Sequence, residues 1–123
     1  MHNLYHQTLM DHYQHPRNRR VLNNAHISVT QENPACGDTV SIQAIVAGDT
    51  LQTITFQGNG CVISQATASL LTQKVQGYTL AQVRELDATF IQSLICVSLG
   101  PTRLKCALLP LKALQEALAT YGT

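Results

Sequence analysis

The sequence is organised around one stretch, Asn33-Pro34-Ala35-Cys36-Gly37-Asp38. In an extended backbone, residues i and i+2 point to the same side, so Cys36 and Asp38 can face one target. Pro34 stiffens the approach to the thiol, and Gly37 permits a turn that other residues resist. A soft sulfur and a hard oxygen held this close together suit a metal ion better than an acid/base reaction.

Segments of alternating hydrophobicity surround this stretch and predict a small sheet. Ile27 and Val29 indicate one strand, residues 40–46 a second, and residues 54–56 a third, with a hairpin turn at 47–50 before the last. The Gly58-Asn59-Gly60 segment is expected to break the third strand. Three antiparallel strands with one apolar face require helices to cover that face, so the predicted class is α+β.

Helical patterns occupy the rest of the chain. Residues 4–15 are amphipathic and end before Pro16. Ser64 is a suitable N-cap for a helix running toward Gln76, with Gly77 as its stop signal. A capping-box pattern, Thr79 with Gln82, opens a short helix reaching about residue 86, and residues 88–99 are predicted to be helical in part.

The last helix is predicted from a stripe of leucines. Proline destabilises a helix except in the first turn, where its missing N–H has no helical partner. Pro110 therefore indicates a helix that starts close to Cys106, with this thiol at its N-terminal end. The stripe is assigned to core packing because its members repeat at helical spacing. It comprises Leu104, Leu108, Leu111, Leu114 and Leu118.

Composition indicates a single globular domain covering residues 1–123. Charged residues make up only 12% of the chain and the net charge is +1, so bulk electrostatic binding of nucleic acid is not expected. The short basic run Arg17, Arg19 and Arg20 is either a solvated patch or a docking patch. The sequence shows no apolar run of membrane-spanning length and no secretory signal, so we expect a cytoplasmic protein without membrane contact, in which the four cysteines are metal-binding or reactive.

Three of the four cysteines share one setting. Cys36, Cys61 and Cys106 each lie at an expected break in regular structure, flanked by Gly, Pro or charge. Lys105 places a positive charge beside Cys106 that favours its thiolate. Together with Asp38, these thiols form a candidate set of three sulfurs and one carboxylate; the alternative is that they are ordinary buried cysteines. Cys96 lies in an apolar run and is interpreted as a core thiol.

At these residues the chain resembles the U-type iron–sulfur cluster scaffold family, which includes IscU, SufU and the N-terminal domain of NifU. The matching motifs come in the family's order and span nearly the whole chain. They are Tyr5, Asp11-His12-Tyr13, Pro16-Arg17-Asn18, Pro34-Ala35-Cys36-Gly37-Asp38, Gly58-Asn59-Gly60-Cys61-Val62-Ile63-Ser64, Ala68-Ser69 and Arg103-Leu104-Lys105-Cys106.

The resemblance implies an IscU-like α+β fold, also described as SufE/IscU-like, with the three family cysteines at one end. It further implies transient assembly of a [2Fe–2S] cluster, with sulfur delivered by a cysteine desulfurase and the cluster passed to downstream apo-proteins or carriers. Cys36, Cys61 and Cys106 would then be cluster or zinc ligands and candidate sulfur acceptors, and Asp38 the fourth ligand. Because carboxylate is a poorer donor for an iron–sulfur core than thiolate, Asp38 fits a cluster that is handed on.

Three departures from the family keep alternatives open. Lys105 replaces the histidine that precedes the third cysteine in IscU and resembles the SufU branch, yet the interval from Cys61 to Cys106 looks too short for the SufU insertion. The segment 99–103 differs from the chaperone-binding segment of IscU. The sequence therefore predicts a scaffold, with a zinc-dependent sulfurtransferase of the SufU type or a zinc-stabilised interaction domain as alternatives, and it leaves enzymatic activity undecided.

Overall fold

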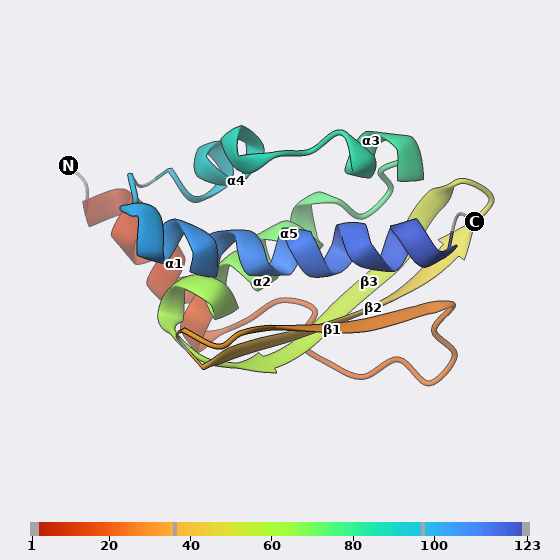
Figure 1. Cartoon of the computed structure of the whole chain (residues 1–123), viewed down its shortest axis with the longest axis horizontal. Coiled ribbons are helices and arrows are strands. Elements are labelled where there is room, and N and C mark those ends of the chain that lie inside the picture. The colour runs from red at the N-terminus through yellow and green to blue at the C-terminus, as the bar shows by residue number, and fades with distance from the viewer. Residues whose placement is uncertain (1–2, 36, 97, 122–123) are drawn as a thin grey trace.

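A computed structural model of the chain describes residues 3–35, 37–96 and 98–121, and Figure 1 shows their arrangement. The described part has the predicted α+β class, with a three-stranded antiparallel sheet and helices. In chain order the elements are α1 (Asn3–Gln14), β1 (Ile27–Asn33), β2 (Asp38–Ala47), β3 (Thr50–Asn59), α2 (Val62–Lys74), α3 (Leu80–Arg84), α4 (Ala88–Ile95) and α5 (Pro101–Tyr121).

The sheet has the order β1-β2-β3, and its register fixes the ends of both hairpins. Asn33 pairs with Asp38 at the first hairpin, and Ala47 pairs with Thr50 at the second. The predicted turn at 47–50 is confirmed, and Gly48 supplies the positive φ of 64° that a tight turn requires. The expected break at Gly58 was placed too early, because β3 stays paired with β2 as far as Asn59.

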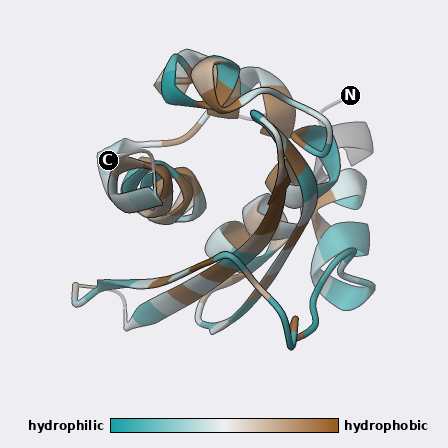
Figure 2. Cartoon of the chain, turned by 90° about the vertical axis from the view of Figure 1, so that its right-hand side faces the viewer, coloured by the Kyte–Doolittle hydropathy of each residue, from teal (hydrophilic) through white to brown (hydrophobic). Residues whose placement is uncertain are grey.

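Alternation along β2 divides the sheet into two faces. Val40, Ile42 and Ala44 are fully buried, while the intervening residues are only partly buried. Helices α2 and α5 lie on the buried face, α1 packs against α2, and α3 and α4 lie on the side of α5 away from the sheet (Figure 1). Figure 2 shows the hydrophobic residues gathered where the sheet and these helices face each other.

One prediction about the start of a helix and one about the burial of a cysteine were wrong. The N-cap of α2 is Cys61, whose side chain accepts a hydrogen bond from the Ser64 N–H, so Ser64 lies inside the helix rather than before it. Cys96 is not a core thiol: it is exposed, and it ends α4 with a left-handed φ of 60°. The capping box of Thr79 and Gln82 is confirmed at the start of α3.

Helix α5 starts earlier than predicted. It begins at Pro101, which is itself well suited to the first turn, and it continues through Pro110. Cys106 is therefore its sixth residue rather than its N-terminal end. Of the leucine stripe, Leu111, Leu114 and Leu118 are buried as predicted, whereas Leu104 and Leu108 are only partly buried.

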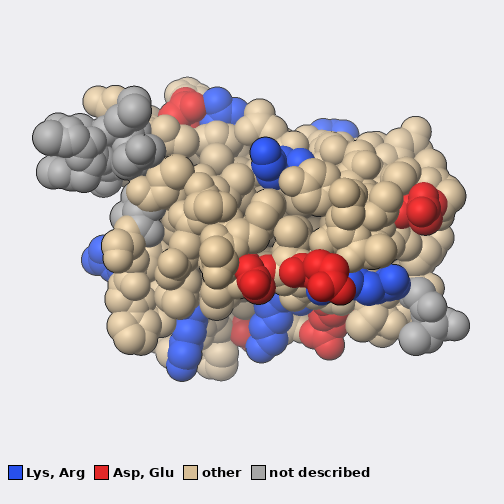
Figure 3. Space-filling model, turned by 90° about the horizontal axis from the view of Figure 1, so that it is seen from above, with Lys and Arg blue, Asp and Glu red and all other residues tan. Residues whose placement is uncertain are grey.

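The basic run 17–20 is attached to the fold rather than fully solvated. Arg17 forms an ion pair with Asp11, with 2.7 Å between Nη2 and Oδ2. Arg19 donates from Nη2 to the Gly58 carbonyl at 2.9 Å, at the end of β3. On the face seen in Figure 3, acidic and basic side chains are interspersed between wide uncharged areas. Among the described residues, no helix has the length and apolar character needed to cross a bilayer.

Candidate metal centre

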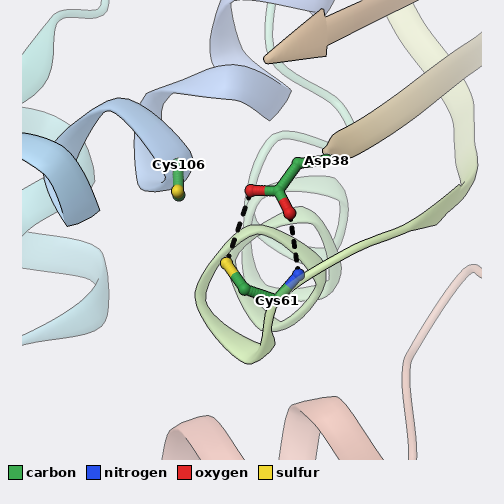
Figure 4. Close-up of side chains that lie close together, drawn as sticks. All are labelled: Asp38, Cys61 and Cys106. Carbon is green, nitrogen blue, oxygen red and sulfur yellow. Dashed lines mark hydrogen bonds between the residues drawn. The ribbon is translucent and has the colours of Figure 1, made fainter. Parts of the chain in front are cut away.

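Three side chains from three different elements meet at one end of the sheet. Asp38 starts β2, Cys61 caps α2, and Cys106 lies in the second turn of α5 (Figure 4). One carboxylate oxygen and the two sulfurs all lie within 4.8 Å of one another. The residues are separated by up to 68 positions in the sequence, so only the packing of α2 and α5 on the sheet brings them together.

Asp38 is held by the residue that it faces. Its side chain is only 1% exposed. Oδ1 accepts a hydrogen bond from the Cys61 N–H at 2.8 Å, and Oδ2 accepts one from the Cys61 thiol, with 3.4 Å between sulfur and oxygen. Burying a carboxylate is costly unless it is hydrogen-bonded or bound to a cation, so these contacts fix the orientation of Asp38.

Gly60 makes this close approach possible. Its φ of 141° lies in a region that side-chain-bearing residues rarely adopt. A β-carbon at this position would lie 2.1 Å from Asp38 Oδ1 and 2.9 Å from the Asp38 α-carbon. The glycine therefore serves both the turn from β3 into α2 and the contact between Asp38 and Cys61.

Cys61 combines exposure with a helix N-terminus. It is exposed, and its sulfur lies 3.5 Å from the backbone nitrogen of Ser64. The first amides of a helix have no acceptor within the helix, and the Cys61 sulfur supplies one for the Ser64 N–H. The hydroxyl of Ser64, which is fully buried, donates to the Cys61 carbonyl at 3.3 Å and so ties the cap to the helix.

Cys106 is the enclosed member of the group. It is 3% exposed, and the side-chain amide of Asn33 donates toward its sulfur at 3.9 Å. Asn33 ends β1, so both ends of the first hairpin reach the site: Asn33 at Cys106 and Asp38 at Cys61. Pro110, one turn further along α5, has no N–H to donate to the Cys106 carbonyl.

The structure brings together three of the four predicted ligands. Cys36 lies outside the described residues, and in the sequence it stands between Asn33 and Asp38. Lys105 is exposed on α5 next to Cys106. Asn33 and Ser64 were not identified as site residues from the sequence. Asn33 is the first residue of the stretch 33–38, and Ser64 follows Cys61 by one helical turn. Their proximity to the cysteines in the sequence could have identified them as site residues.

The donor set fits a thiophilic metal. Two sulfurs bound 2.3 Å from a tetrahedral zinc lie about 3.8 Å apart. The described donors all lie within 4.8 Å of one another, a limit within about 1 Å of this spacing. Two thiolates and a carboxylate are ligands that zinc and iron accept, whereas calcium and magnesium prefer oxygen alone.

Comparison with known proteins places the chain in a family. A family model described as the NifU-like N terminal domain matches residues 4–123. The chain is 37% identical to the zinc-dependent sulfurtransferase SufU of Bacillus subtilis (strain 168), with 94% of this chain and 90% of that protein covered. It is 33% identical to the iron-sulfur cluster assembly scaffold protein IscU of Rickettsia prowazekii (strain Madrid E), with 95% and 91% covered.

A solved structure agrees on the fold. The N-terminal part of a nitrogen-fixing NifU-like protein from Brucella abortus superimposes with a TM-score of 0.78, covering 98% of this chain and 96% of that one. At 15% identity, this likeness concerns the fold alone. The alignment with SufU spans 133 positions, more than the 123 residues here, so that relative carries residues that this chain lacks. By the match over residues 4–123 and by these relatives, the chain belongs to the NifU-like N-terminal domain family.

Proposed function

We propose that this protein accepts sulfur from a cysteine desulfurase and serves as a scaffold on which a [2Fe–2S] cluster is assembled and then handed on. The observation that carries the proposal is the convergence of Asp38, Cys61 and Cys106 within 4.8 Å, in a chain whose relatives include named scaffold proteins. Cys36 is proposed as the fourth ligand, because it shares its hairpin with Asn33 and Asp38. The cluster is cargo, assembled and released rather than kept.

The two described thiols of this site differ in their access to a partner. Cys61 is exposed and Cys106 is buried, so of these two thiols Cys61 is the one that a partner can reach. In sulfur acceptance, the Cys61 thiolate attacks the outer sulfur of a cysteine persulfide on the desulfurase. The S–S bond of the desulfurase breaks, its cysteine leaves as a thiolate, and a persulfide forms on Cys61 without net oxidation.

Asp38 orients Cys61 for metal binding. Without metal, its Oδ2 accepts the Cys61 S–H, and its Oδ1 holds the Cys61 amide. A thiol must lose its proton to bind metal, so loading is expected to release protons and to redirect both side chains from each other toward the ion. A carboxylate in a set of thiolates weakens the hold on an iron–sulfur core, which suits release.

A zinc-dependent sulfurtransferase is the second candidate function. It is favoured by the similarity to SufU and by Lys105, whose charge beside Cys106 favours thiolate. In that case zinc would be held by Cys36, Asp38, Cys61 and Cys106 and would keep the thiols deprotonated. A plain zinc-stabilised interaction domain would use the same ligands without any sulfur chemistry.

One experiment separates these functions. The protein is incubated anaerobically with iron, cysteine and a desulfurase, and its iron, zinc and acid-labile sulfide are then measured. Iron and sulfide in equal amounts support the scaffold. Retained zinc with stimulated desulfurase turnover and no sulfide supports the sulfurtransferase. Retained zinc without an effect on turnover leaves the interaction domain.

Single substitutions test the ligand assignment. Cys61→Ser and Cys106→Ser are expected to abolish cluster assembly, because each removes a sulfur from the centre, and Cys36→Ser is expected to do the same. Cys96→Ser is the matched control, since Cys96 is exposed at the end of α4. Intact cluster assembly after loss of Cys61 or Cys106 would contradict the proposed site.

A further inference from the structure

A groove runs beside the thiol site between the end of β1 and α5. It has a volume of about 390 Å³, with Glu32, Asn33 and Pro34 on one wall and Lys105, Leu108, Leu109 and Lys112 on the other. We propose that this α5–β1 groove binds an extended acidic segment of the sulfur-donating partner. The proposal deepens the proposed function and rests on it for the identity of the partner.

The α5 wall of the groove is one continuous face of the helix. Its four residues follow the spacing i, i+3, i+4, i+7, so their side chains project from the same side of α5. Lys105 and Lys112 mark the ends of this face, about 10 Å apart at 1.5 Å per residue. Leu108 lies between them and is only partly buried, so a charged residue stands at each end of an apolar strip.

The charges of the groove select an acidic ligand. Lys105 and Lys112 are exposed, and within the described part of the chain neither forms an ion pair. Among the described residues that line the groove, Glu32 is the one acidic residue, so these residues carry two positive charges against one negative. On the far side of Lys112 a second hollow is lined by Asp87 and Glu116, which disfavours an acidic ligand there and confines it to the β1 side.

The groove also leads to the thiols. Asn33 lines it and donates its side-chain amide toward the Cys106 sulfur at 3.9 Å. Lys105 precedes Cys106 in the helix, and Pro34 opens the hairpin that contains Cys36. A segment anchored at Lys112 and Lys105 would therefore deliver the residues that follow it to the cysteine site. This is what a sulfur-donating loop requires.

The geometry defines the ligand further. Two carboxylates about 10 Å apart with an apolar side chain between them would complement the lysines and Leu108. A polyproline II segment repeats every three residues and rises about 3.1 Å per residue, so acidic residues at i and i+3 have this separation on one side. The inferred ligand is a segment with acidic residues three apart, so that both face the lysines of the groove.

A peptide tests the groove without any sulfur chemistry. The probe is a fluorescent peptide carrying glutamate, proline, leucine and glutamate in this order, and its binding to the full chain is followed by anisotropy. Because exposed ion pairs are weak, Lys112→Glu is expected to reduce the affinity only about 3- to 10-fold, and added salt should reduce it as well. Lys74→Glu, at an exposed lysine at the end of α2, is the matched control and should leave the affinity unchanged.

Two further peptides sharpen the test. Replacing both glutamates by lysine should abolish binding, and placing the glutamates next to each other should weaken it, because only one can then reach a lysine. The inference is overturned if Lys112→Glu and Lys74→Glu have equal effects, or if the lysine peptide binds as well as the glutamate peptide.

A desulfurase assay separates this inference from the proposed function. Lys112→Glu is expected to raise the concentration of this protein needed for half-maximal stimulation of the desulfurase, while the maximal rate stays the same. Equal half-maximal concentrations for the Lys112→Glu and unsubstituted proteins would contradict the binding role of the groove, while the proposed sulfur acceptance would still stand. Absence of any stimulation or sulfur transfer with the unsubstituted protein contradicts the proposed function itself, whatever the peptide does.

Discussion

At the scale of single residues, Gly60 decides whether Asp38 and Cys61 can meet. The neighbouring glycine at 58 is equally confined, since a β-carbon there would lie 2.2 Å from the Thr39 carbonyl oxygen. Gly58 lies near the end of β3, and Gly60 directly precedes the capping cysteine. The glycines of this segment therefore do more than break a strand: they let the backbone pass against β2 closely enough to build the site.

Gly60→Ala is expected to damage both stability and the site. The strained backbone alone costs about 1–3 kcal/mol, and the β-carbon would push Asp38 away from Cys61. Zinc titration should show a loss of affinity of at least about tenfold, which is the loss typical when a supporting contact of a metal site is removed. Gly48→Ala is the control, because that position also has a positive φ but open space around it. Unchanged zinc affinity in Gly60→Ala would contradict the role given to this glycine.

His12 gives the fold a pH dependence of known sign. It is buried against α2, where Nδ1 lies 2.7 Å from Ser69 Oγ. Burial, and then the charge of Arg17, hold the pKa of His12 below 6.5, and Asp11 opposes this only in part. The folded state therefore binds a proton at His12 less readily than the unfolded chain does. The contribution of His12 to the free energy of unfolding is fully present above pH 6.5 and is lost as the pH falls through 6.5 toward the lower folded pKa.

Urea unfolding at pH 7.5 and pH 5.5 checks this expectation. The unfolding midpoint should be lower at pH 5.5, and His12→Gln should reduce the difference, whereas substitution of the exposed His15 should not. NMR titration of His12 in the unsubstituted protein measures the same pKa directly. The pKa of Asp11 is also lowered, by its hydrogen bond with Arg17, but its contribution is lost only below pH 3.8, outside this window.

At the scale of elements, helix ends place the chemistry. Cys61 is both a predicted ligand and the N-cap of α2, so the same side chain begins the helix and faces Asp38. Helix α5 starts at Pro101, which puts Cys106 one full turn inside the helix and turns its side chain into the protein. One thiol is therefore presented to the outside and the other is enclosed.

Thr79→Ala tests an element that lies away from the site. The Thr79 hydroxyl accepts from the Gln82 N–H at 3.0 Å, and the Gln82 side chain accepts from the Thr79 N–H at 2.8 Å. Loss of the cap is expected to lower the free energy of unfolding by about 1 kcal/mol. Thr102→Ala, at an exposed threonine in the first turn of α5, should cost less. Zinc affinity should not change in either variant, and a change in Thr79→Ala would indicate coupling between α3 and the site.

At the scale of the whole molecule, a bound metal would link three elements that otherwise meet through apolar packing and a few hydrogen bonds. Asp38 belongs to the sheet, Cys61 to α2 and Cys106 to α5. Zinc that binds the folded state and not the unfolded chain should raise the free energy of unfolding by about 4 kcal/mol at a thousandfold excess over its Kd. Thermal unfolding with zinc and with a chelator measures this difference. The double substitution of Cys61 and Cys106 by serine should remove it, and a metal-dependent shift that persists in the double variant would place the ion elsewhere.

Local patterns were enough to predict the strands and most helices, and they named the candidate ligands that the structure brings together. Alternation revealed β2, the Thr79 and Gln82 pair revealed α3, and the family motifs revealed Asp38, Cys61 and Cys106. Two predictions from local sequence failed because tertiary packing decided the exposure of one residue and the start of one helix. Its apolar neighbours predicted a buried Cys96, yet Cys96 ends α4 and is exposed. The preference of proline for the first helical turn predicted that α5 starts near Cys106, yet the helix starts at Pro101 and contains Pro110 in its interior.

The sequence by itself determined the class of fold and the kinds of donor atom, because hydrophobic periodicity, turn residues and motif spacing are local properties of the chain. Only the tertiary structure decided that Cys61 is open and Cys106 enclosed, that Gly60 admits Asp38, and that two lysines of α5 border a groove leading to the thiols. Those features depend on how α2 and α5 pack on the sheet. That packing is fixed by the burial of the whole apolar core, which no short stretch of sequence specifies.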